Sequence, residues 1–231
     1  MRYGYGIDWT YLVFVLPAAL IALWAQLHVN SAFSKYSNVR NTRGLTGAQT
    51  SEYILRTYGV QGVRIEHIAG NLTDHYDPTD NVIRLSDSVY NSTSVAAVGV
   101  AAHETGHALQ YAFGYAPIKA RAAVIPATRI GSYASWPLLI IGMVFSIRPL
   151  IWAGILLFSL VTLFQLLTLP VEFNASSRAL QAIDEWNILS PEEYQGAKKV
   201  LTAAALTYVA ALLTSLMQLL RLVVLFGGRR D

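Results

Sequence analysis

Residues 92–114 read STSVAAVGVAAHETGHALQYAFG, and this stretch decides how the rest of the chain is interpreted. It opens with hydroxyl side chains that suit a helix N-terminus, continues with small and apolar residues, and ends at Gly114, which suits a helix C-terminus. The stretch therefore predicts one helix with His103, Glu104 and His107 near its middle. On an α-helix, residues four positions apart lie about 40° apart around the axis and roughly 6 Å apart along it. Both histidines are thus expected to point the same way.

The pattern H-E-x-x-H at His103, Glu104 and His107 matches what metal-assisted hydrolysis needs. Two neutral imidazoles on one helix face can hold Zn²⁺, and a glutamate one step around the helix reaches a water molecule rather than the metal. The alternative is a helix whose two histidines only face solvent or pack in a core. The carboxylate at the general-base position favours a site for one Zn²⁺ ion, with Glu104 as the catalytic base.

The composition predicts an integral membrane protein. Hydrophobic residues make up 54% of the 231 residues and charged residues only 13%, whereas soluble chains carry about 25% charged residues. The net charge of +3 is small and scattered, and no basic cluster is interleaved with aromatic residues, which argues against a nucleic-acid partner. The chain contains no cysteine, so metal ligands must come from His, Asp and Glu.

Four apolar stretches are candidates to cross a bilayer, which takes about 20 helical residues. The predicted transmembrane helices cover residues 9–27, 131–147, 150–169 and 201–222. The first lacks the features of a cleaved signal peptide and is expected to be a retained anchor. The second is short and contains Pro137. The second and third are expected to form a helical hairpin, which returns the residues after 169 to the side of His103 and His107.

A polar region of about residues 30–130, completed by residues 170–198, is expected to form a small α+β unit. Two capping boxes, Thr46–Gln49 and Ser190–Glu193, predict helix starts, and Pro170 predicts another because proline suits the first turn of a helix.

Residues 63–67 and 81–85 alternate like strands, and residues 73–78 between them have turn chemistry. The predicted fold is a mainly α integral membrane protein, with about four transmembrane helices and this small α+β unit in a single domain over residues 1–231.

The third zinc ligand has to come from further along the chain, because a catalytic zinc site normally has three protein ligands and a water. No third histidine lies near the motif, so the downstream carboxylates are the candidates. Glu172 follows a predicted membrane span and has apolar neighbours, where an unpaired carboxylate is costly. The alternative is a glutamate that faces the lipid headgroups. Glu172 is the preferred candidate.

Four separated motifs carry a resemblance that covers nearly the whole chain. They are residues 72–78 (LTDHYDP), residues 103–110 (HETGHALQ), residues 171–176 (VEFNAS) and residues 203–211 (AAALTYVAA). These motifs resemble the YugP-like neutral zinc metallopeptidases of bacterial membranes, which are distantly similar to HtpX-like and CAAX-processing proteases. In those proteases a glutamate in an E-x-x-A-D context is the third ligand. Glu172 matches that glutamate and Ala175 the alanine, while Ser176 stands in place of the aspartate.

The resemblance and the chemistry together predict a gluzincin-like endopeptidase that acts on a protein or peptide substrate. His103, His107 and Glu172 would hold the zinc, and Glu104 would take a proton from water and pass it to the leaving amine. Residues 81–85 are expected to be the exposed strand edge along which a peptide pairs. His75, Arg178 and Tyr208 are candidate oxyanion donors or substrate contacts, although each also has a purely structural explanation.

The membrane orientation is predicted from basic residues near the span ends. Nine lie on the side of the histidines: Lys35, Arg40, Arg43, Lys119, Arg121, Arg129, Arg178, Lys198 and Lys199. Five lie on the other side: Arg2, Arg148, Arg221, Arg229 and Arg230. This bias predicts a cytoplasmic active site at a bacterial inner or plasma membrane, with both termini outside.

Two other functions compete with the peptidase. A membrane scaffold or chaperone-like protein with a structural metal site would have no need of a general base, so Glu104 argues against it. A metal transporter would need ionisable residues inside several spans, and the first three predicted spans have essentially none.

Overall fold

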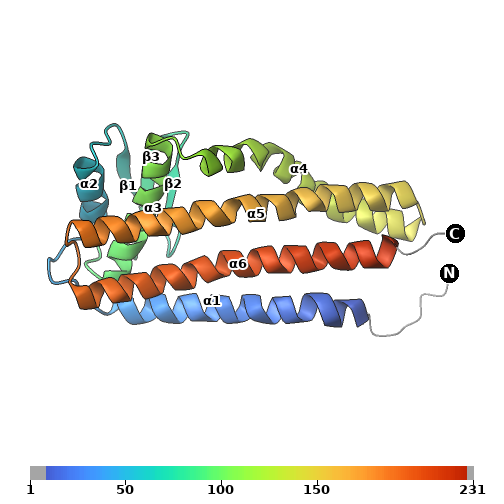
Figure 1. The fold of residues 1–231 in the computed structure, drawn as a ribbon, viewed down its shortest axis with the longest axis horizontal. Coiled ribbons are helices and arrows are strands. Elements are labelled where there is room, and N and C mark those ends of the chain that lie inside the picture. Colours follow the sequence, from blue (N-terminus) through green and yellow to red (C-terminus); the bar gives the residue numbers. More distant parts are fainter. Residues whose placement is uncertain (1–8, 228–231) are drawn as a thin grey trace. The chain divides into compact units, whose positions relative to one another are not determined.

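The structure is a computed structural model that describes residues 9–227, so Arg2, Arg229 and Arg230 of the orientation count lie outside the described residues. The elements are η1 (Tyr11–Val15), α1 (Leu16–Ser37), α2 (Gly47–Thr57), β1 (Arg64–Ile68), β2 (His75–Asp77), β3 (Val82–Ser86), α3 (Val95–Ala112), α4 (Ala116–Val144), α5 (Arg148–Glu185) and α6 (Pro191–Gly227) (Figure 1). The chain forms two compact units. The helical unit comprises described residues 9–25, 120–168 and 207–227, and the mixed unit comprises residues 26–119 and 169–206.

The helical unit carries the apolar segments that the composition indicated. Among the described residues, three helices are long and apolar enough to cross a membrane: Tyr11–Ser37, α5 and α6. Only 17–28% of their most apolar windows is buried, and side chains such as Leu156 on α5 and Val224 on α6 are 68% and 53% exposed. Exposed apolar surface of this extent suits hydrocarbon rather than water. The predicted second span falls largely within α4, which is not one of the three.

A tight turn joins α4 to α5, as the predicted hairpin requires. Ser146 takes a positive φ of 56°, and the Ile147 N–H donates to the Gly142 carbonyl over 2.8 Å. The two helices then approach closely, because a Cβ on Gly154 would lie only 2.9 Å from the Ser135 carbonyl oxygen. Small residues at such a crossing allow two apolar helices to pack backbone to backbone.

Pro170 does not begin a helix, and this prediction is wrong. It lies inside α5, which runs without interruption from Arg148 to Glu185. A proline within a helix removes one backbone hydrogen bond. Val171 and Ala175 directly after it are completely buried, and we attribute the continuation of the helix to this packing.

The mixed unit contains a three-stranded sheet in the order β1-β3-β2. Strands β1 and β3 are parallel with Arg64 opposite Val82, which confirms both predicted strands to within one residue. Strand β2 is antiparallel to β3 with His75 opposite Arg84. The interpretation of residues 73–78 as turn alone is therefore wrong. The predicted exposed edge at residues 81–85 is also wrong, because β3 is the central strand.

Helix α3 lies at the centre of the mixed unit, beside the strands (Figure 1). One face packs with α2 and the sheet through the buried side chains of Ala97, Ala101 and Leu85. Another face of α3 packs with α5 and α6 through residues such as Val98 and Ala102. Burial on both sides fixes the rotation of α3 about its axis, and so the direction in which His103 and His107 point.

Side-chain hydrogen bonds cap the starts of α2, α3 and α6. The predicted capping box at Thr46 and Gln49 is present at the start of α2. At α6, the Ser190 N–H donates to Glu193 over 2.9 Å and the Glu193 N–H donates to the Ser190 hydroxyl over 3.3 Å. Ser94 caps α3 by accepting from the Ala97 N–H. The predicted stop of this helix is confirmed, since Gly114 follows its C-cap with a φ of +66°.

Candidate metal centre

Three side chains from two helices of the mixed unit meet at one point. His103 and His107 come from α3 and Glu172 comes from α5. Glu172 Oε2 lies 3.2 Å from His103 Nε2 and 3.4 Å from His107 Nε2, and the three possible ligand atoms all lie within 4.8 Å of one another. Their side chains are only 12%, 11% and 6% exposed. The two histidines and Glu172, which lie far apart in the sequence, therefore come together at one buried position.

These distances fit a zinc ion. Ligands arranged tetrahedrally about 2.0–2.1 Å from Zn²⁺ lie about 3.3–3.4 Å from one another, close to the separations of Glu172 Oε2 from the two imidazoles. Two neutral nitrogen donors with one carboxylate also form the ligand set of catalytic zinc sites that keep a position open for water. The residues present thus suit zinc in both geometry and chemistry.

A close approach between α3 and α5 brings the ligands together. A Cβ on Gly106 would lie 2.5 Å from the Ala175 carbonyl oxygen, a distance that no larger side chain could tolerate without moving the backbone. Gly106 lies between the two histidines on α3, and Ala175 lies one turn after Glu172 on α5. The glycine inside the motif therefore sets the distance over which Glu172 reaches the imidazoles.

A chain of hydrogen bonds through Gln110 selects the tautomer of the neutral His107 ring. The Gln110 Nε2 donates to the Val171 carbonyl over 2.7 Å and to Asn174 Oδ1 over 3.0 Å. Asn174 Oδ1 also accepts from Arg178 Nε over 2.8 Å. Arg178 can only donate and a carbonyl oxygen can only accept, so Gln110 Oε1 is left facing His107 Nδ1 at 3.0 Å. His107 Nδ1 must then carry the proton, and its Nε2 presents a lone pair toward Glu172 and the metal position.

Ser176 lies beside His103 as Gln110 lies beside His107. Its hydroxyl lies 3.1 Å from His103 Nδ1, so a serine here can orient the imidazole as a carboxylate does at other zinc sites. Sequence reasoning had given no role to either Ser176 or Gln110. The signal for Gln110 was its position three residues after His107, which places both side chains on one helix face.

Glu104 is buried directly beside the ligands. The backbone N–H of Tyr76 on β2 donates to Glu104 Oε2 over 3.0 Å, while Glu104 Oε1 makes no hydrogen bond to any other described residue. Burial raises the pKa of Glu104 to about 7; His103 opposes this shift, and the nearby carboxylates of Glu172 and Asp74 add to it. A carboxylate with a pKa near neutrality can both accept and release a proton at physiological pH.

The three candidate oxyanion donors lie in different surroundings. His75 is on β2 and its Nδ1 lies 2.8 Å from the Thr73 carbonyl. Arg178 is bound to Asn174 and lies over the rings of Phe113 and Tyr115, at 6.0 and 5.9 Å from their centroids. Its guanidinium therefore supports the Gln110 network. Tyr208 is on α6 in the helical unit, and its role stays a prediction, as does that of His75.

Comparison with known proteins agrees with this geometry. The family model described as "Putative neutral zinc metallopeptidase" matches residues 11–227. A protein named "Putative membrane protease YugP" from Bacillus subtilis (strain 168) is 48% identical over 220 residues, which cover 95% of this chain and 98% of that relative. No solved structure matches the chain.

Proposed function

Because this chain belongs to the family of neutral zinc metallopeptidases, we propose that it is an integral-membrane endopeptidase that uses His103, His107 and Glu172 to hold one Zn²⁺ ion. The observation that carries this proposal is the convergence of three ligand atoms beside a buried general base. When bound, the zinc would supply Lewis acidity toward a water molecule and toward the scissile carbonyl. The other catalytic contributions come from the side chains and the backbone of the protein.

The chain's own part in the reaction centres on Glu104. The Tyr76 N–H holds Glu104 Oε2, which leaves Oε1 to accept the proton of the attacking water. The same carboxyl group then delivers that proton to the nitrogen of the leaving amine. Gln110 and Ser176 keep the two imidazoles in the orientation that presents Nε2 to the metal. The Ser176 hydroxyl and the Gln110 amide thus belong to the proposed site together with the ligands.

The substrate is proposed to bind as an extended peptide along β2 rather than along residues 81–85. Strand β2 has one edge paired with β3, and its Tyr76 N–H already reaches Glu104. A peptide that adds to the other edge of β2 would run past the general base. Backbone pairing of this kind gives affinity with little dependence on side chains, which suits an endopeptidase.

We place the enzyme in a bacterial inner or plasma membrane with its metal centre on the cytoplasmic side. Support comes from the three apolar helices, from the relative named as a membrane protease and from the bias of basic residues.

The test is hydrolysis of casein by purified zinc-loaded protein, compared with Glu104→Gln. The variant keeps the three ligands and the shape of the side chain, so zinc should stay bound at one ion per chain. Cleavage should fall at least 100-fold, because general-base catalysis contributes about 10²–10⁴-fold. Equal cleavage by the two proteins would point to a contaminating protease and would contradict the proposal.

A further inference from the structure

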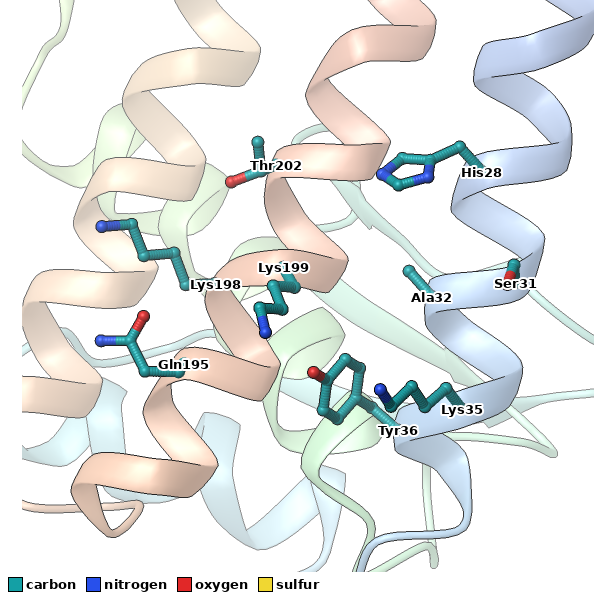
Figure 2. A pocket seen from close by; sticks show the side chains of 9 residues that line it. All are labelled: His28, Ser31, Ala32, Lys35, Tyr36, Gln195, Lys198, Lys199 and Thr202. Atoms are coloured by element: carbon teal, nitrogen blue, oxygen red, sulfur yellow. The ribbon is translucent and has the colours of Figure 1, made fainter.

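One hollow in the mixed unit contains none of the proposed zinc-site residues. It has a volume of about 470 Å³ and is lined by residues of α1 and α6 (Figure 2), a size that falls within the range of about 300–1,000 Å³ typical of ligand sites. The chain has only four lysines, and three of them line this hollow: Lys35, Lys198 and Lys199. Such a concentration of one cationic residue type calls for a physical explanation.

No carboxylate among the described residues pairs with these lysines. The lining contains no Asp or Glu, and within residues 9–227 none of the three lysines forms an ion pair with a carboxylate. Figure 2 shows Lys35 reaching from α1 past Tyr36 toward α6, Lys199 lying along α6, and Lys198 on the flank of α6 that faces away from α1. Close positive charges repel one another and raise the local concentration of anions. The hollow is therefore built to attract an anion.

The position of the lysines along their helices indicates which anion. Lys35 is the first charged residue after residues 9–34, and Lys199 is the last before residues 200–220, both of which lack Asp, Glu, Lys and Arg. Both runs belong to helices that are long and apolar enough to cross a membrane. The first charge beyond such a run lies at the level of the lipid headgroups. The anions present at that depth are the phosphates of the lipids themselves.

We propose that this hollow binds the phosphate of an anionic glycerophospholipid from the surrounding bilayer. Lys35 and Lys199 would contact the phosphate from opposite sides, and the hydroxyls of Ser31 and Thr202 in the lining offer hydrogen-bond donors for the headgroup. The apolar turns that precede Lys35 on α1 and those that follow Lys199 on α6 would accommodate the acyl chains. A basic pocket between two membrane helices is a recognised arrangement for holding acidic lipid headgroups.

The experiment measures lipid binding to the full-length protein in neutral detergent. Short-chain phosphatidylglycerol, short-chain phosphatidylcholine and inorganic phosphate are titrated separately, and bound ligand per chain is counted by native mass spectrometry. Phosphatidylglycerol should bind at least tenfold more tightly than phosphatidylcholine. The double variant Lys35→Gln/Lys199→Gln should weaken phosphatidylglycerol binding roughly 30-fold, since each basic residue near an anionic lipid surface contributes about fivefold.

The matched control removes two positive charges elsewhere, by Arg56→Gln/Arg64→Gln on α2 and β1, and should keep phosphatidylglycerol affinity within twofold. If the double variant does not fold, as judged by circular dichroism and zinc content, the single variants Lys35→Gln and Lys199→Gln should each lose about fivefold. Equal binding of the two lipids, equal loss in the control, or tighter binding of inorganic phosphate than of phosphatidylglycerol would each overturn the proposal. The same titration on Glu104→Gln should be unchanged, which separates this site from the proposed peptidase activity.

Discussion

Gln110 determines which nitrogen of His107 can serve as a ligand. Its amide donates to two oxygens on α5 and accepts from the imidazole on α3, so one side chain connects the two helices that carry the proposed zinc ligands. Replacing it removes the partner of His107 Nδ1 and allows the ring to rotate or change tautomer. Partners of this kind typically account for 10–100-fold in metal affinity.

We therefore expect Gln110→Ala to weaken zinc binding about 10–100-fold without abolishing it. The measurement is competition with a chromophoric zinc chelator on purified protein. Glu172→Ala, which removes a ligand, should fail to retain stoichiometric zinc under the same conditions. Gln181→Ala, an exposed glutamine on α5, is the matched control and should bind as tightly as wild type. Wild-type affinity in Gln110→Ala would show that His107 needs no partner at Nδ1.

We expect the stability of the metal-free protein to depend on pH because of Glu104. Burial raises its pKa in the folded state from 4.5 to about 7, so the folded state favours the protonated carboxyl. The resulting stabilisation is fully present below pH 4.5 and is lost as the pH rises through about 7. A rise of this size in the pKa corresponds to about 3 kcal/mol in the free energy of unfolding.

The measurement is unfolding of chelator-treated protein at pH 5 and pH 8, with Glu104→Gln as the reference because its amide does not titrate. Between the two pH values the free energy of unfolding of the wild type should fall by about 2–3 kcal/mol more than that of the variant, because the unfolded-state glutamate is already mostly ionised at pH 5. An identical pH dependence in both proteins would show that Glu104 is solvated in the metal-free state.

At the residue scale, the sequence predicted most readily what is local. His103, Glu104 and His107 follow from spacing on one helix, and Glu172 follows from its apolar setting. Ser176 and Gln110 were not recognised because their roles depend on how α5 is rotated against α3. That rotation is set by packing, and no pattern within either segment encodes it.

At the scale of elements, the contact between α3 and α5 determines whether a site exists. The two helices meet where Gly106 lies against the backbone of Ala175. Glycine in a helix interior costs about 1 kcal/mol relative to alanine, so its presence here has to be balanced by the packing that it allows. Gly99, about two turns earlier on the same helix, is less constrained: a Cβ there would lie 3.4 Å from the Ala197 Cβ.

Gly106→Ala should therefore both destabilise the protein and weaken zinc binding. Forcing a methyl group against the α5 backbone typically costs about 1–3 kcal/mol, and separating the helices moves Glu172 away from the histidines. Unfolding in detergent and zinc stoichiometry together measure the effect. Gly99→Ala adds the same methyl group to the same helix and should be neutral or slightly stabilising. Normal zinc content in Gly106→Ala would show that the helix contact does not position Glu172.

The elements also show where sequence reasoning reached its limit. Thr46 and Ser190 marked the starts of α2 and α6 correctly because capping is a local interaction. Strand β2 was missed because its strand character comes from pairing with β3, while its own residues favour a turn. The order of the three strands and the continuation of α5 through Pro170 likewise depend on contacts between distant segments.

At the scale of the whole molecule, the proposed zinc ligands constrain the membrane topology. His103 and His107 precede residues 120–168, and Glu172 follows them, yet all three belong to the mixed unit. If α5 crosses the bilayer, the chain between the histidines and Glu172 must cross an even number of times. We therefore propose that α4 crosses as well, although it is not among the three helices that length and composition alone single out. Helix α4 contains most of the predicted second span, and the proposed site requires this span to cross.

Reporter fusions test this topology. With the metal centre in the cytoplasm, a reporter placed after Ser146, in the turn between α4 and α5, should be active only outside. One placed after Asn187, between α5 and α6, should be active only in the cytoplasm, and one after Gly227 only outside. A cytoplasmic signal at Ser146 with an external signal at Asn187 would mean that α4 does not cross. The histidines and Glu172 would then lie on opposite sides of the membrane, and the proposed zinc site could not form.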